Sequence, residues 1–276
     1  MRHGSERRGD PVELQASGPV VVLTFAHSGV ASLESVLSGH ADLACTSGTG
    51  IIPLCAQAAA TWRRVEHGSE TMSALAASSA RALAATMITC ILARSAGSRW
   101  CETVTSPANS ADAFAELFPL AQFVCFYRAC SPVISAATQV SRWGLTSAGA
   151  GDFTSTYPGN NVAAAAAYWC AYTSALLEFE SAHLKRILRI RHEDLAANPA
   201  VTTGLIAKFL GLSGRHANLP SPPAASTDAK SASSEMSTAE ADQIPLELMP
   251  GPMRDRVNGL HSRLGYSSLG QTVEDS

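Results

Sequence analysis

Three groups of polar residues carry the side chains best suited to chemistry in this chain: His27-Ser28-Gly29, Arg128 and His192-Glu193. A glycine turn before a helix leaves backbone amides free to face a phosphate or a sulfate. Arginine forms charge-assisted hydrogen bonds with such anions, and histidine takes up or releases a proton near neutral pH. The three groups together therefore predict an anion-binding site that holds a titratable side chain.

Each group follows a short segment that predicts a β-strand. Pro19–Phe25, Gln122–Tyr127 and Ile187–Arg191 are rich in β-branched, aromatic and leucine residues. After the first segment, apolar residues recur at helical spacing from Val30 onward, so a helix follows the Gly29 turn. Repeated strand-then-helix units predict a parallel sheet with right-handed crossovers, and ligands bind such sheets beyond the carboxyl ends of the strands. The polar groups are therefore expected at one shared edge.

The rest of the chain is predicted to form one domain over residues 18–266, with an extension at 1–17 and a tail at 267–276. Ser131 is expected to cap a helix that starts at Pro132 and runs to about Trp143. Residues 213–241 are rich in serine, alanine and proline, which predicts an irregular surface loop. Further helices are predicted at Ser73–Ala93, Ala163–Ala182, Pro199–Leu210 and Leu246–Arg263.

The composition narrows the class of protein. With 276 residues, 46% of them hydrophobic, the chain can bury a substantial core, and its net charge of -3 gives no general attraction to nucleic acid or membranes. We identify no secretory signal, and the apolar run Ala82–Ala93 is too short to span a bilayer. The seven cysteines include no Cys-x-x-Cys pair, which favours a cytoplasmic protein with reduced thiols and no zinc site. A small molecule is the expected partner, and the oligomeric state stays open.

Several motifs follow one another along the chain. They are the strand with its Gly29 turn, Phe118-Pro119-x-Ala121-x-Phe123-x-x-x-Tyr127-Arg128, Ser141-Arg-Trp-Gly144, Arg189-Ile-Arg-His-Glu-Asp-Leu195, Phe209-Leu-Gly-Leu212 and Arg256-Val-Asn-Gly-Leu-His-Ser-Arg-Leu-Gly-Tyr266. In this order they resemble bacterial sulfotransferases that depend on 3'-phosphoadenosine 5'-phosphosulfate (PAPS). The resemblance implies an α/β, P-loop-type fold with a central parallel sheet flanked by helices, although the turn lacks the Gly-Lys-Ser/Thr of a Walker loop. It also implies direct transfer of a sulfuryl group to a hydroxyl of a small metabolite, with no metal.

By this resemblance, the first turn binds the phosphosulfate of PAPS through Ser28, Gly29 and Ser32, and His27 stands at the position of a basic residue. Relatives carry a pair of hydroxyl residues where this chain has Val30-Ala31. The donor site implied by the resemblance is therefore incomplete at its first turn.

The 3'-phosphate of PAPS is expected to contact Arg128. The matching serine position is Ala136 here, which leaves the neighbouring Ser135 as the candidate. Threonine stands where relatives carry a lysine before the second strand, and Thr238–Asp242 replaces a basic Gly-Arg-Gly-like segment. A charge-assisted contact contributes about 1.5 to 3 kcal/mol, so the loss of three weakens donor binding by roughly 4 to 9 kcal/mol, on the order of a thousandfold or more.

His27 and Glu102 are the candidates for taking the proton of the acceptor hydroxyl. The alternatives are a basic anion contact or a polar turn residue for His27, and a solvated loop carboxylate for Glu102. By resemblance, His192-Glu193-Asp194 forms a structural cap in which Glu193 holds the neighbouring backbone.

Three functions stay open for this chain. The first is PAPS-dependent sulfuryl transfer to a hydroxyl of a natural-product-type metabolite. In the second, the donor has been lost and the pocket carries out an acid/base step, such as dehydration or cyclisation of a biosynthetic intermediate. The third is a non-catalytic protein that binds a ligand or stabilises a partner.

Overall fold

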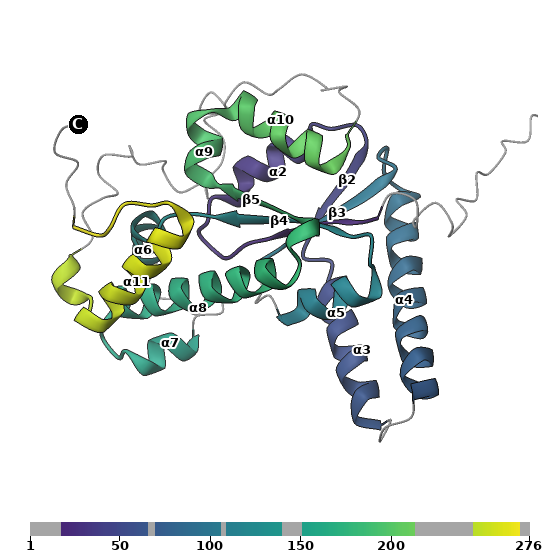
Figure 1. The fold of residues 1–276 in the computed structure, drawn as a ribbon, viewed down its shortest axis with the longest axis horizontal. Coiled ribbons are helices and arrows are strands. Elements are labelled where there is room, and N and C mark those ends of the chain that lie inside the picture. Colours follow the sequence, from purple (N-terminus) through teal and green to yellow (C-terminus); the bar gives the residue numbers. More distant parts are fainter. Residues whose placement is uncertain (1–17, 66–69, 106–108, 140–150, 213–244, 271–276) are drawn as a thin grey trace, which may run out of the picture.

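A parallel sheet of five strands lies at the centre of the computed structural model (Figure 1). The structure describes residues 18–65, 70–105, 109–139, 151–212 and 245–270. The strands are β1 (Val20–Leu23), β2 (Leu43–Ser47), β3 (Arg99–Val104), β4 (Gln122–Tyr127) and β5 (Ile187–Arg191). Their order across the sheet is β2-β3-β1-β4-β5, so β1 is the central strand.

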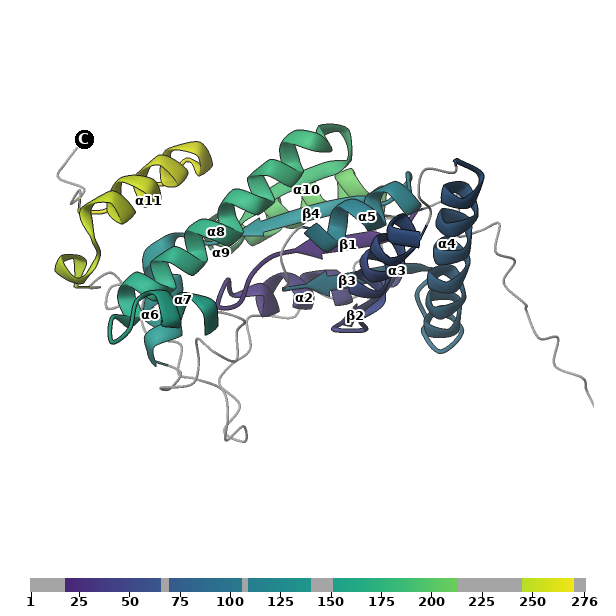
Figure 2. The same cartoon turned by 90° about the horizontal axis from the view of Figure 1, so that it is seen from below.

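Helices cover both faces of the sheet (Figures 1 and 2). Along β1, Val20 and Val22 belong to one buried cluster, whereas Val21 and Leu23 belong to the other. One face is covered by α2 (Val30–Ser38), α9 (His192–Ala197) and α10 (Pro199–Leu210), and the other by α3 (Ile51–Val65), α4 (Glu70–Leu92), α5 (Asn109–Leu117) and α8 (Asn161–Ala182). A parallel sheet that is buried on both faces confirms the expected α/β fold.

The last described part of the chain packs beside α8. α6 (Cys130–Gln139), α7 (Gly151–Thr156) and α11 (Gly251–Leu264) all contact α8. Val257 and Leu260 of α11 are buried in the same core as Trp169 of α8. Two short 3-10 helices, η2 (Leu184–Arg186) and η3 (Leu246–Leu248), precede β5 and α11. α11 therefore shares the main core with the sheet.

The three predicted strands are confirmed, and β4 and β5 have the expected bounds. β2 and β3 escape sequence analysis because they carry polar residues inside the sheet, such as Thr46 and Glu102. These side chains pair with each other across the two strands. A search for continuous apolar runs therefore misses both strands.

Two predicted helix boundaries are wrong. α6 begins at Cys130 rather than at Pro132, because the amide of Cys130 donates to Nε2 of His261 at 3.2 Å and so finds a partner outside the helix. The predicted helix over Leu246–Arg263 is divided into η3 and α11 at Pro250. The predicted extension of α6 to Trp143 and the loop over 213–241 lie outside the described residues.

α4 is longer and more apolar than the sequence analysis expects. Its portion Ala74–Leu92 meets the length and composition of a membrane-crossing helix, which corrects the estimate based on Ala82–Ala93. Core helices of soluble proteins meet the same criterion. Here Ala80, Ala84 and Ile88 pack in the core, and α4 lies beside α3 in a hairpin that projects from the sheet (Figure 1).

Candidate functional site

The turn after β1 has a left-handed backbone at two positions. His27 has φ 65° and Gly29 has φ 75°, and His27 is the one non-glycine with positive φ among the described residues. A left-handed conformation costs a residue with a side chain roughly 1 to 2 kcal/mol. Strain of this kind persists where the surrounding structure holds it, and it often marks functional sites. Gly29 then caps α2 without a side-chain hydrogen bond, so the first helical amides, at Val30 and Ala31, have no intrahelical partner.

Neighbouring side chains support this turn through hydrogen bonds. The hydroxyls of Thr24 and Ser28 lie 2.8 Å apart, and Thr24 also donates to the carbonyl oxygen of Phe126 at 3.0 Å. Because Thr24 has only one hydroxyl proton, Ser28 must donate to Thr24. On the other side of the turn, the Tyr168 hydroxyl of α8 accepts from the amide of Ala26 at 3.0 Å.

His192 lies directly against Gly29. A Cβ atom at residue 29 would come within 2.6 Å of Cδ2 and 2.7 Å of Nε2 of the imidazole ring, and 3.6 Å from Nη1 of Arg128. These distances exclude any side chain unless His192 moves. Burial and the charge of Arg128 lower the pKa of His192. A neutral imidazole therefore covers one side of the turn.

Arg128 joins the end of β4 to the same turn. Its Nη1 donates to the carbonyl oxygen of His27 at 3.0 Å, which confirms the predicted proximity of these residues. Nε of Arg128 and Nε2 of His27 are both buried without a partner among the described residues. Burial, followed by the charge of Arg128, lowers the pKa of His27, so its imidazole is neutral at pH 7. The turn thus combines polar atoms that have no described partner with one cation, the guanidinium of Arg128, which a hydrogen bond holds in place.

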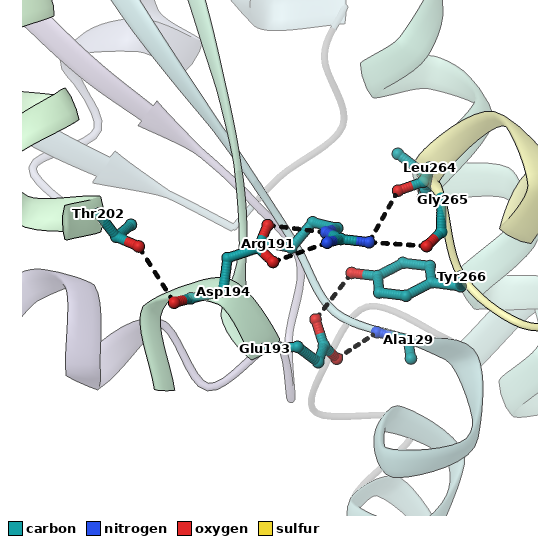
Figure 3. Close-up of polar contacts among 8 residues, drawn as sticks. All are labelled: Ala129, Arg191, Glu193, Asp194, Thr202, Leu264, Gly265 and Tyr266. Atoms are coloured by element: carbon teal, nitrogen blue, oxygen red, sulfur yellow. Dashed lines mark hydrogen bonds and ion pairs between the residues drawn. The ribbon is translucent and has the colours of Figure 1, made fainter. Parts of the chain in front are cut away.

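Glu193 ties this edge of the sheet to the C-terminal segment (Figure 3). One carboxylate oxygen accepts from the amide of Ala129 at 2.9 Å, and the other accepts from the Tyr266 hydroxyl at 2.9 Å. Burial raises the pKa of the Tyr266 hydroxyl, and the neighbouring Glu193 carboxylate adds to this effect. The predicted role of Glu193 in holding neighbouring backbone is confirmed.

Arg191 makes a second connection to the same segment (Figure 3). Its guanidinium donates to both carboxylate oxygens of Asp194, at 2.8 and 2.6 Å, and Nη1 donates to the carbonyl oxygen of Gly265 at 2.7 Å. This contact lies at the left-handed C-cap of α11. β5 and α9 therefore hold the end of α11 close to Arg128.

Two of the three serines proposed as donor contacts, Ser28 and Ser32, already use their hydroxyl and amide hydrogens within the protein. Ser28 donates its hydroxyl to Thr24 and its amide to Phe25, and Ser32 donates both its hydroxyl and its amide to the carbonyl oxygen of Gly29. Ser135 lies on α6, where its hydroxyl accepts from the Gln139 amide at 3.0 Å. The roles of all three serines as donor contacts stay predictions, and those of Ser28 and Ser32 require their hydroxyls to reorient.

Glu102 lies at the ends of β2 and β3. One carboxylate oxygen accepts from both the amide and the hydroxyl of Thr49, each at 2.8 Å, and the other is bonded to the hydroxyl of Thr46. Glu102 is only 2% exposed, so it is not the solvated loop carboxylate of the alternative interpretation. It holds the β2–α3 loop, and its role as a base stays a prediction.

A pocket of about 460 Å³ opens between this loop and α2. Its described lining includes two carboxylates, Glu34 and Glu102, and no lysine or arginine. The remaining lining residues are Val30, Ser47, Gly48, Gly50, Pro53, Thr103, Val104 and Thr105. Val30 and Glu34 belong to α2, the helix that begins at the Gly29 turn, so the pocket adjoins that turn.

A model of the sulfotransferase family matches residues 19–216. The chain belongs to the sulfotransferase family. Three solved structures share its fold: the sulfotransferase domain of the curacin biosynthetic pathway, that of the olefin synthase of Synechococcus PCC 7002, and a sulfotransferase from Alicyclobacillus acidocaldarius. Their TM-scores are 0.57, 0.57 and 0.52, and their identities are 16%, 18% and 13%. The alignments cover 91%, 90% and 90% of this chain and 98%, 94% and 96% of those chains. No curated protein matches the sequence.

Sequence reasoning misses two parts of the site in this sulfotransferase-family protein. The sequence analysis does not single out Tyr168 or Trp169 within their helix, yet Tyr168 supports the turn and Nε1 of Trp169 donates to the carbonyl oxygen of Arg128 at 2.9 Å. His192 is expected at the edge but not against Gly29. Because His192 directly follows a strand, the sequence places it at the edge of the sheet. The contact between its imidazole ring and Gly29 depends on side-chain geometry, which the sequence does not show.

Proposed function

We propose that this protein transfers a sulfuryl group from PAPS to a hydroxyl group of a small metabolite. The observation that carries the proposal is the β1 turn, which combines free helical amides, the partly buried imidazole of His27 and the guanidinium of Arg128. Membership of the sulfotransferase family supports it further. A cytoplasmic location also belongs to the proposal, because all seven cysteines are free thiols.

The residues of the turn suit the phosphosulfate of PAPS better than the residues of the pocket do. Backbone amides and Arg128 favour an anion, whereas Glu34 and Glu102 disfavour one. The donor would therefore occupy the turn, and the acceptor the adjoining pocket beside α2. This arrangement predicts a neutral or cationic acceptor.

In the proposed reaction, the acceptor oxygen forms a bond to sulfur while the bond between sulfur and the 5'-phosphate oxygen breaks. Adenosine 3',5'-bisphosphate leaves, and the hydroxyl proton passes to a base. His27 suits this role because its imidazole is neutral at pH 7 and Nε2 has no partner among the described residues. Amides at the start of α2 would stabilise the charge that develops on the leaving 5'-phosphate, and Arg128 would hold the 3'-phosphate of the same nucleotide.

Binding of adenosine 3',5'-bisphosphate tests the donor site. We expect titration calorimetry at low salt to show weak, saturable binding that is lost in Arg128→Ala. Arg256→Ala is the matched control, because Arg256 lies exposed on α11, and it should bind like the wild type. Binding that survives in Arg128→Ala, or no binding to the wild type, contradicts the proposed donor site.

Transfer itself is tested by release of the bisphosphate from PAPS in the presence of a panel of alcohols and phenols. We expect release that depends on an added acceptor and is lost in His27→Ala. If Glu102→Gln alone abolishes release while the protein stays folded, the base is Glu102 rather than His27.

A second function is favoured by the hydrogen bonds of the turn and by the charge of the pocket. Ser28 and Ser32 use their donors internally, and the pocket carries Glu34 and Glu102. These features suit an acid/base step without PAPS, such as loss of water from a hydroxylated intermediate. Incubation with neutral hydroxy ketones in the absence of nucleotide, followed by mass spectrometry, would detect the loss of water. If neither turnover nor nucleotide binding occurs, the result favours the third alternative, a non-catalytic protein.

A further inference from the structure

Two thiols face each other across β2 and β3, away from the anion-binding turn. The parallel register pairs Cys45 with Cys101, so both side chains leave the sheet on the same face. Cys101 is buried in the cluster beneath α2, and Cys45 packs against the same cluster. Neighbouring strands lie about 4.8 Å apart, which is within the roughly 4.4 to 6.8 Å between the Cα atoms of a disulfide.

A second pocket gives small molecules a route to this pair. It has a volume of about 170 Å³ and is lined by both cysteines, with Leu37 and Ser38 of α2 among its walls. A water molecule occupies about 30 Å³ of liquid, so a molecule as small as hydrogen peroxide fits. Cys45 is half-buried, whereas Cys101 is 1% exposed. Cys45 is therefore the thiol that a reagent meets first.

We propose that Cys45 and Cys101 are a redox-modification site, which hydrogen peroxide or an organic hydroperoxide converts to a reversible disulfide. The proposal is independent of sulfuryl transfer. Cys45 as the thiolate attacks one peroxide oxygen: an S–O bond forms, the O–O bond breaks, and hydroxide leaves. Cys101 then attacks the sulfur of the resulting sulfenic acid, forms the S–S bond and releases water. Two thiols are oxidised by two electrons in total, and one hydrogen peroxide is reduced to two waters.

The surroundings assign different roles to the two thiols. Hydrogen bonds from Cys101 and Ser38 lower the pKa of Cys45, although burial and the charge of Glu34 oppose them. The same pair interaction, together with burial, raises the pKa of Cys101. Cys45 is thus the better nucleophile, and Cys101 is the resolving thiol.

Reversibility follows from the position of the pair at the second pocket. Both cysteines line a pocket, so a disulfide there stays accessible to a small dithiol, which attacks one sulfur and regenerates the two thiols. Because Cys45 and Ser38 line the same pocket, oxidation changes the surface that the sheet presents to the end of α2. This helix begins at the Gly29 turn.

The test uses the full-length, reduced protein treated with an equimolar amount of hydrogen peroxide, followed by alkylation and peptide mapping. We expect a loss of two alkylated thiols per chain and a cross-linked peptide that contains Cys45 and Cys101. Dithiothreitol should restore both thiols. Cys90→Ser is the matched control, because Cys90 is exposed and lies on α4, and it should form the same cross-link.

Variants of the pair separate the two steps. Cys45→Ser should lose no thiol at this dose, and Cys101→Ala should accumulate a sulfenic acid at Cys45 that dimedone traps. Circular dichroism checks that each variant is folded, and Cys101→Ser replaces Cys101→Ala if the latter unfolds. Unchanged alkylation of both thiols in the wild type, or a cross-link only between separate chains, overturns the proposal.

Discussion

The hydrogen bond between Tyr266 and Glu193 is expected to stabilise the whole C-terminal segment. Tyr266→Phe removes the hydroxyl that donates to Oε2 of Glu193 at 2.9 Å and leaves the aromatic ring in place. The guanidinium of Arg191 lies 5.3 Å from the centre of that ring, and this contact survives the substitution. A hydrogen bond to a charged group contributes about 1.5 to 3 kcal/mol. Because both side chains are only partly buried, we expect a loss near about 1.5 kcal/mol.

A double-mutant cycle isolates this bond from the other contacts of Glu193. Glu193→Ala also removes the acceptor for the amide of Ala129, so its own cost exceeds that of Tyr266→Phe. The coupling between the two substitutions should be about 1.5 kcal/mol, and urea unfolding of the four proteins measures it. Tyr157→Phe is the control, because no described hydrogen bond involves the Tyr157 hydroxyl, and it should change stability by less than about 0.5 kcal/mol.

A coupling below about 0.5 kcal/mol would refute this reasoning, since the two residues would then act independently. A large cost for Tyr157→Phe would also contradict it, because any buried tyrosine hydroxyl would then have the same effect.

Three further predictions concern the turn and the histidines. Gly29→Ala should destabilise the protein more than Gly159→Ala and should abolish bisphosphate binding. Both glycines have φ near 75°, but of the two only residue 29 has a ring within 3 Å of the new Cβ. Equal melting temperatures of the two variants would contradict this prediction. His27→Gly should preserve or raise the free energy of unfolding, by up to about 1 kcal/mol, because it relieves a left-handed residue, while sulfuryl transfer is lost. Burial lowers the pKa of His261 below 6.5, so the folded state binds fewer protons and stability falls as pH drops below 6.5. Urea unfolding between pH 7.5 and 5.5 should show that the free energy of unfolding falls by at most about 1.4 kcal/mol per pH unit for each such histidine. In His261→Asn, the free energy of unfolding should depend less steeply on pH.

The sequence predicts the central strand β1 and the neighbouring strands β4 and β5, because β1 and β4 are almost entirely apolar and β5 carries three branched apolar residues, Ile187, Leu188 and Ile190. It misses β2 and β3, whose polar residues find partners only across the sheet, as Glu102 does with Thr46 and Thr49. Local apolar patterns do not reveal such long-range pairing.

The shared edge is predictable for a similar reason. The carboxyl ends of parallel strands converge whatever their side chains, which brings His27, Arg128 and His192 together. The contact between His192 and Gly29 depends instead on a rotamer and on backbone strain. Likewise, the internal hydrogen bonds of Ser28 and Ser32 follow from the local geometry of the turn, which spacing in the sequence does not encode.

The central position of β1 has an evolutionary consequence. The turn draws on β1, β4 and β5, whereas the acidic pocket draws on β2, β3 and the β2–α3 loop, so the two regions occupy different halves of the sheet. Substitutions in one half can accumulate without displacing the other. α2 borders both, through Gly29 at its N-cap and Glu34 along its length. A lineage could therefore diversify its pocket while keeping its turn, and co-variation between the two should concentrate on this helix.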